Sequence, residues 1–135
     1  MRYLLDTNIC IYLINRGPRH DTVLRHMDGL TYGTILISAI TAAELRYGVA
    51  KSARQKQNRE KFENFLSRFE IVDFDGDAAT AYGSLRATLE NAGTPIGPLD
   101  TLIAAHALSL ECTLVTNNEK EFQRVPRLRV KNWTK

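Results

Sequence analysis

Short apolar runs alternate along this chain with longer stretches in which apolar side chains recur every three or four residues. Runs of four or fewer residues bounded by polar or turn-forming residues predict buried strands, at residues 2–5, 34–37, 69–72, 113–115 and 128–130. The longer stretches have the spacing of helices that bury one face, and predict helices at residues 9–16, 19–28, 39–51, 55–68, 77–91 and 99–110.

Strands that alternate with helices predict an α/β fold, with a mostly parallel sheet covered by helices on both sides. The 135 residues fit one domain with a single core, and we expect residues 1–135 to form it. The turn at residues 93–98, rich in glycine and proline, separates the last two long helices. The pattern gives the alternation but does not give the order of the strands.

The composition is that of a soluble globular protein, with 44% hydrophobic and 24% charged residues. No apolar run approaches the roughly 20 residues that a membrane span needs. Asp6 interrupts the region where a secretory signal would be apolar, so we expect a cytoplasmic protein. Cys10 and Cys112 lie in apolar stretches without the spacing of a zinc site or a disulfide framework, and we expect both in the core.

The net charge of +3 and the pI near 9.0 favour an anionic partner without identifying it. Residues 51–61 carry five basic side chains against one acid, and the five are Lys51, Arg54, Lys56, Arg59 and Lys61. Residues 120–135 carry six basic side chains against Glu121. Both clusters have two interpretations: solvated surface, or contacts to nucleic-acid phosphates that position without specifying sequence.

The acidic residues fall where predicted strands end or where the following helices begin. Asp6 follows the first strand, Glu44 lies in the helix after the second, and Asp100 opens the helix at residues 99–110. Residues 118–121 follow the strand at 113–115. The carboxyl ends of parallel strands meet at one edge of a sheet, so these acids predict a carboxylate cluster of the kind that binds a hard divalent cation.

Each acid also has a local interpretation: a helix cap for Asp6 or Thr7, a capping box from Thr41 to Glu44, and first-turn positions for Asp100, Glu119 and Glu121. Caps have no reason to gather at one edge of a sheet. Two carboxylates about 4 Å apart repel by about 4 kcal/mol at an effective dielectric constant near 20. A bound divalent cation would remove that repulsion, and the joint arrangement therefore favours the metal site.

Four segments together resemble the PIN-domain nucleases, and most closely the VapC toxins of bacterial toxin–antitoxin modules. They are Leu5-Asp6-Thr7-Asn8, Ser38 to Gly48, Asp100 to Ala107, and Leu114 to Phe122. The resemblance covers essentially the whole chain, in order. It implies a three-layer αβα sandwich around the sheet and an endoribonuclease that depends on Mg²⁺ or Mn²⁺.

The resemblance also implies roles for individual residues. Asp6 and Asp100 would bind the metal directly, while Glu44 would hold a second metal or orient water. Thr7 and Thr116 would hydrogen-bond to carboxylates or phosphate. Many PIN domains have an aspartate where this chain has Asn118. We expect Glu121, one helical turn further on, to supply the missing carboxylate.

The partners implied by the resemblance are RNA, a VapB-type antitoxin and a second copy of the chain in a homodimer. The turn at residues 95–100 and the ending at residues 130–133 are similar to VapC toxins of enteric type, which cleave initiator tRNA in the anticodon stem-loop. We therefore expect a tRNA substrate, with the basic side chains of residues 51–61 gripping the RNA backbone.

Three other functions fit the sequence less well. A phosphatase of the haloacid-dehalogenase type requires an aspartate at position 8, which is Asn8 here, and structure-specific DNA nucleases with PIN-like acids are longer. A non-catalytic RNA-binding or regulatory module would explain Asn118 but not the retained acids. The three histidines do not form a catalytic set, and we expect His106, on an apolar helix face, to be packed in the core.

Overall fold

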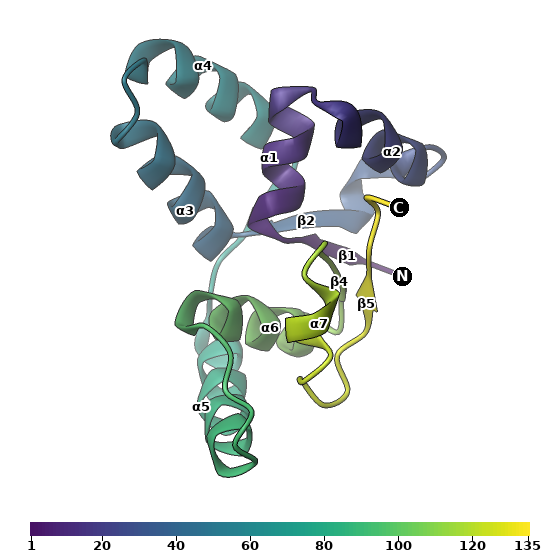
Figure 1. The fold of residues 1–135 in the computed structure, drawn as a ribbon, viewed down its shortest axis with the longest axis vertical. Helices are drawn as coiled ribbons and strands as arrows, with labels where there is room; N and C mark the ends of the chain where they lie inside the picture. The colour runs from purple at the N-terminus through teal and green to yellow at the C-terminus, as the bar shows by residue number, and fades with distance from the viewer.

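The computed structural model describes residues 1–135 and contains one five-stranded sheet, in which every pair of neighbouring strands is parallel. The strand order is β3-β2-β1-β4-β5, so the first strand lies at the centre of the sheet. The strands are β1 (Tyr3–Leu5), β2 (Ile35–Ser38), β3 (Glu70–Val72), β4 (Thr113–Val115) and β5 (Val130–Lys131). Figure 1 shows the sheet between two groups of helices.

Seven α-helices and one short 3₁₀ helix connect the strands. They are α1 (Thr7–Asn15), α2 (Pro18–Met27), η1 (Tyr32–Thr34), α3 (Ala39–Ala50), α4 (Gln55–Leu66), α5 (Gly76–Asn91), α6 (Pro98–Leu110) and α7 (Glu119–Phe122). The predicted strands and long helices are therefore confirmed, with boundaries that differ by a few residues. None of the helices is long and apolar enough to cross a membrane.

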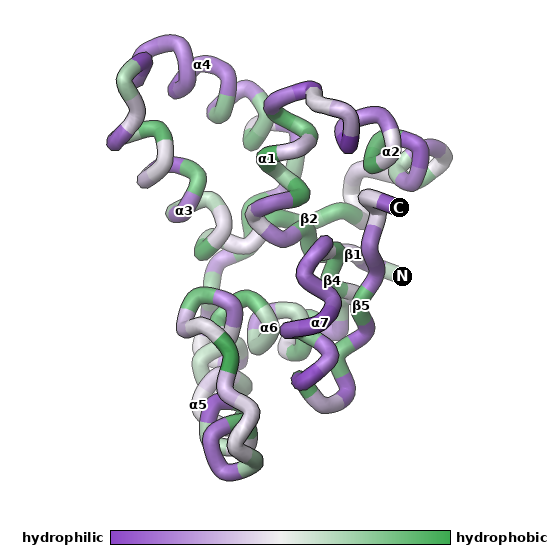
Figure 2. The backbone as a smooth tube through the Cα atoms, in the orientation of Figure 1, coloured by the Kyte–Doolittle hydropathy of each residue, from purple (hydrophilic) through white to green (hydrophobic).

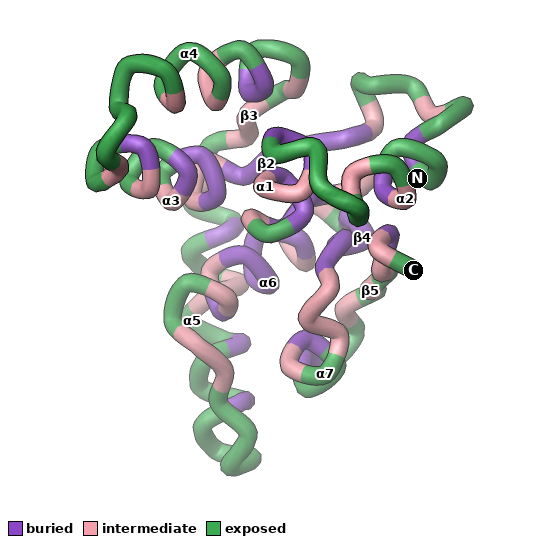
Figure 3. Tube along the Cα trace, turned by 45° about the horizontal axis from the view of Figure 1, so that its top comes forward, coloured by how far each residue is buried: buried purple, intermediate pink, exposed green.

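The core has two parts because alternate residues of each strand point to opposite faces of the sheet. Leu5, Ile37 and Val115 face a cluster that includes side chains from α1 to α4. Leu4, Leu36 and Leu114 face a second cluster built with α5, α6 and α7. The result is the predicted three-layer αβα sandwich, in which the central strands β1, β2 and β4 are largely buried (Figure 3) and the edge strands β3 and β5 are not.

Helices α3 and α4 form an arm on one side of the sheet, which we call the α3–α4 arm (residues 39–66; Figure 1). Most of α4 is hydrophilic and exposed (Figures 2 and 3), and it contacts the core mainly through Phe65 and Leu66 near its end. Bidentate hydrogen bonds from Arg46 on α3 to Glu63 on α4, both 3.0 Å long, join the two helices. The arm thus presents the basic residues to solvent.

The predicted core residues are confirmed. Cys10 and Cys112 are buried, unpaired thiols. His106 is buried on α6, where its Nδ1 is 2.8 Å from the hydroxyl of Ser38, the residue that caps α3. Burial lowers the pKa of His106, so the imidazole is neutral and structural. Its hydrogen bond ties α6 to the beginning of α3.

Candidate active site at the carboxyl ends of the strands

Asp6 is held rigidly between the end of β1 and the beginning of α1. Its Oδ1 accepts a hydrogen bond of 2.8 Å from the Thr7 amide, so Asp6 caps α1, and its Oδ2 accepts one of 2.8 Å from the Thr116 hydroxyl after β4. Burial raises the pKa of Asp6, the two hydrogen bonds oppose that rise, and the charge of Glu121 adds to it. The cap interpretation and the cluster interpretation are therefore compatible at this residue.

Glu44 reaches the same region from α3. Its Oε1 accepts a hydrogen bond of 2.8 Å from the hydroxyl of Thr7, the residue next to Asp6. The capping box from Thr41 to Glu44 is wrong, because α3 begins earlier, at Ala39, and Ser38 caps it by accepting a hydrogen bond from the Ile40 amide. Thr41 is buried inside the helix, which leaves the Glu44 side chain free to pair with α1.

The carboxylates of Asp100 and Glu121 lie next to each other beside Gly97. A methyl group at Gly97 would be 3.6 Å from Asp100 Oδ2 and 3.8 Å from Glu121 Oε1. The Gly97 amide donates a hydrogen bond of 2.9 Å to Glu121 Oε1, and the Asn118 side-chain amide donates one to Glu121 Oε2. Asn118 thus contacts the carboxylate cluster, because its side-chain amide holds the Glu121 carboxylate in place.

The charges of this cluster are coupled. The pKa of Asp100 is raised to about 7, first by burial and then by the negative charges of Glu121, Asp6 and Glu44. Burial also acts to raise the pKa of Glu121, but hydrogen bonds from Gly97 and Asn118 outweigh it and hold that pKa below its ordinary value. In the absence of a cation, Asp100 is therefore the group that takes up a proton.

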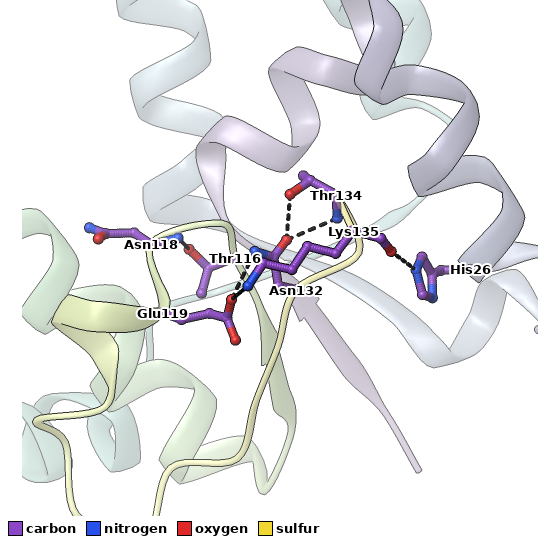
Figure 4. Close-up of polar contacts among 7 residues, drawn as sticks. All are labelled: His26, Thr116, Asn118, Glu119, Asn132, Thr134 and Lys135. Carbon is purple, nitrogen blue, oxygen red and sulfur yellow. Dashed lines mark hydrogen bonds and ion pairs between the residues drawn. The ribbon is translucent and has the colours of Figure 1, made fainter.

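Glu119 does not join the cluster, although it belongs to the same acidic stretch as Glu121. Its carboxylate accepts hydrogen bonds from Asn132 and Lys135 of the C-terminal segment, each 3.0 Å long (Figure 4). Residues two positions apart on a helix point in widely different directions. The two acids of this stretch therefore point in different directions: Glu121 lies next to Asp100, and Glu119 points to the C-terminal segment.

The five basic residues of the α3–α4 arm lie outside the cluster. Lys51, Arg54, Lys56, Arg59 and Lys61 are all exposed. Lys61 donates a hydrogen bond of 3.3 Å to Asn15 at the end of α1, and Lys51 lies over the ring of Tyr47. None of the five pairs with Asp6, Glu44, Asp100 or Glu121, so their charges remain available to a polyanion.

Two supporting residues were not predicted. Gly97 was interpreted only as part of a turn, yet its amide anchors Glu121. Asn117 donates a hydrogen bond of 2.9 Å to the Tyr12 hydroxyl and so fixes the loop after β4 against α1. The Gly97-Pro98 pair marks a helix start, but no signal in the sequence indicates which carboxylate its amide meets.

The donor set suits a divalent cation, although no three acidic, histidine or cysteine side chains are already arranged to hold one. The groups present are carboxylates, which are the oxygen ligands that Mg²⁺ and Mn²⁺ prefer. The pKa of Asp100 is raised first by burial and then by the negative charges of its neighbours, which no cationic side chain of the cluster compensates. The chemistry of these residues therefore fits a hard divalent cation.

Comparison with known proteins agrees with this geometry. The PIN domain family model matches residues 3–128. Ribonuclease VapC2 of Rickettsia felis is 50% identical over 136 residues, which cover 100% of both chains. The tRNA(fMet)-specific endonuclease VapC of Salmonella typhimurium is 42% identical over 133 residues, which cover 98% of each chain.

Solved structures also include proteins with a similar fold. The crystal structure of VapBC2 from Rickettsia felis, bound to a DNA fragment from their promoter, contains a chain that superposes with a TM-score of 0.88 at 46% identity. That match covers 98% of this chain and 99% of the other. The chain therefore belongs to the PIN-domain family and, within it, to the VapC ribonucleases.

Proposed function

We propose that this protein is a Mg²⁺- or Mn²⁺-dependent endoribonuclease that cleaves tRNA and, as the toxin of a VapBC-type module, inhibits translation. The observation that carries the proposal is the coupling of four carboxylates from separate parts of the chain. Asp6, Glu44, Asp100 and Glu121 come from the end of β1, from α3, from α6 and from α7, and the pKa of Asp100 responds to all three of the others.

In this proposal Asp6 and Asp100 would hold the metal, and Glu44 would hold a second ion or orient the attacking water. Glu121 supplies a fourth carboxylate, which Asn118 keeps in place. Thr7 and Thr116 hold Glu44 and Asp6. When bound, a divalent cation lowers the pKa of water and neutralises the charge that develops on the phosphate.

The exposed basic residues of the α3–α4 arm are the proposed RNA contacts: Lys51, Arg54, Lys56, Arg59 and Lys61. Their spacing along one hydrophilic helix and the turn before it suits the phosphates of a folded RNA, which proteins recognise largely by shape. Contacts of this kind strengthen binding without selecting a base sequence. The choice of the bond to be cut would then come from the RNA fold around the acidic site.

The relatives guide the finer parts of the proposal. The Salmonella relative is named for tRNA(fMet), and we propose that this chain also cuts tRNA, with the anticodon stem-loop of initiator tRNA as the first candidate. The Rickettsia relative was crystallised as VapBC2, and we propose a VapB-type antitoxin as partner. We also propose that residues 1–135 act as one PIN domain and that two copies form a homodimer.

The experiment incubates the protein, purified free of antitoxin, with total bacterial tRNA in Mn²⁺ or in EDTA and maps the new RNA ends. Asp6→Asn is the inactive variant and Glu60→Gln, an exposed acid on α4, is the matched control. We expect a discrete cut that requires both metal and Asp6. Intact tRNA, with ribosomal RNA cleaved in a parallel incubation, would refute the proposed tRNA substrate. RNA binding without cleavage would favour the non-catalytic module.

A further inference from the structure

The C-terminal segment (residues 132–135) contacts α7 through one acidic residue, Glu119. Asn132 Nδ2 and Lys135 Nζ each lie 3.0 Å from the same oxygen of Glu119, Oε1 (Figure 4). Asn132 Oδ1 accepts hydrogen bonds from the amide and the hydroxyl of Thr134, 2.9 and 2.6 Å long. These bonds form an Asx turn, so both ends of the Asn132 side chain are engaged.

The C-terminal segment is itself anchored to the body of the protein. Trp133 is buried, its ring lies 5.0 Å from that of Tyr3 on β1, and it stacks on His26 of α2 at 6.0 Å. His26 Nε2 lies 2.9 Å from the carbonyl oxygen of Lys135 (Figure 4). Asn132 therefore reaches Glu119 from a support that is fixed independently of α7.

Helix α7 needs such support because it has only four residues, too few to be stable alone. Its position is defined from two sides. On one side Glu121 accepts a hydrogen bond from the Gly97 amide, and on the other Glu119 accepts one from the Asn132 side-chain amide.

We propose that Asn132 is a positioning residue for the nuclease site, acting through Glu119, with Lys135 in a supporting role. By holding the first turn of α7, Asn132 keeps Asn118 hydrogen-bonded to Glu121 and keeps Glu121 next to Asp100. The inference rests on the proposed function for its effect on RNA cleavage. The placement of Glu121 can be measured without any cleavage.

The test exchanges the donor and the acceptor of the hydrogen bond between Asn132 and Glu119. Asn132→Asp keeps the oxygen that accepts from Thr134 but turns a second oxygen towards Glu119, so it breaks only the contact with α7. The double variant Asn132→Asp with Glu119→Gln restores a donor and an acceptor with their roles exchanged. Asn91→Asp, at the exposed end of α5, is the control for added charge.

The first readout is the amide of Gly97, whose hydrogen bond to Glu121 reports the position of α7. We expect Asn132→Asp to accelerate its hydrogen exchange by about tenfold, since local opening follows the loss of local contacts. The double variant and Asn91→Asp should exchange at the wild-type rate. Unchanged exchange in Asn132→Asp, or exchange that the double variant fails to restore, would overturn the proposal.

The second readout is cleavage of tRNA in Mn²⁺. Outer partners of metal ligands typically contribute about 10- to 100-fold to metal affinity or activity, and we expect Asn132→Asp to lower kcat about tenfold without changing KM for RNA. The double variant should recover kcat. Inactivity of the wild type would refute the proposed function alone, because the exchange of Gly97 decides the positioning separately.

Discussion

Replacing Asp100 with asparagine should stabilise the metal-free protein at alkaline pH, although it removes a proposed metal ligand. Asparagine has the shape of the protonated acid but never acquires the charge that Glu121, Asp6 and Glu44 oppose. The pKa of Asp100 rises from 3.8 to about 7. Between these values the folded protein binds more protons than the unfolded chain, so stability falls as pH rises through this range.

The size of the effect follows from the same two values. The difference between 3.8 and about 7 corresponds to about 4 kcal/mol at 1.36 kcal/mol per pH unit. Asp100 is partly exposed, and solvent screens its charge, so we reduce this to about 1–2 kcal/mol. A carboxylate in the first turn of α6 regains about 0.3–1 kcal/mol from the helix dipole. Burial of the charge and its repulsion by the neighbouring acids together therefore exceed the favourable interaction with the helix dipole.

Urea unfolding in EDTA measures this difference directly. We expect Asp100→Asn to exceed the wild type by about 1–2 kcal/mol at pH 8, and by less at pH 5, where the folded wild type is mostly protonated at this residue. Glu60→Gln serves as the surface control and should follow the wild type at both values. An Asp100→Asn variant that is less stable than the wild type at pH 8 would refute the reasoning and identify Asp100 as a helix-stabilising acid.

Three further predictions concern other parts of the site. Millimolar Mn²⁺ should raise the melting temperature of the wild type, since a ligand at 100 times its Kd adds about 2.7 kcal/mol; scanning calorimetry that finds no shift would count against a cation site. Thr116→Val removes the donor to Asp6 and the acceptor of the Asn118 amide, and should cost about 1–3 kcal/mol in urea unfolding; an unchanged unfolding midpoint would contradict it. The triple variant Arg54→Gln, Lys56→Gln, Arg59→Gln should weaken tRNA binding. The slope of log K against log salt concentration should become shallower by about 0.7–0.9 for each lost phosphate contact. An unaltered slope in filter binding would exclude the α3–α4 arm as the RNA contact.

The fold could be predicted from the sequence because its signals are local. Apolar runs and helical spacing locate the strands and long helices within a few residues of their observed positions. The strand order could not be predicted, since β1 pairs with both β2 and β4, and nothing in a short apolar run specifies its neighbours. The capping box at Thr41 failed because Ser38, still within β2, is the better placed cap.

The site was predictable in outline for a similar reason. Parallel strands deliver the residues at their carboxyl ends to one edge of the sheet, which brings Asp6 and the loop after β4 together. Asp100 reaches that edge from the first turn of α6, which follows α5 and not a strand. The pairing of Thr7 with Glu44 and of Gly97 with Glu121 depends on how separate helices pack. The different directions of Glu119 and Glu121 follow from their two-residue separation on α7. The partners of Glu119, Asn132 and Lys135, depend on the anchored C-terminal segment, which the sequence pattern does not reveal.

Calorimetric titration of Mn²⁺ into the antitoxin-free protein tests the central claim, that the carboxylate cluster binds a divalent cation, most directly. The account predicts saturable binding to the wild type, binding that is lost in Asp6→Asn and in Asp100→Asn, and weakened binding in Glu121→Gln. Glu60→Gln should bind as the wild type does. Absence of binding to the folded wild type, or binding to Asp6→Asn and Asp100→Asn as tight as to the wild type, would contradict the account.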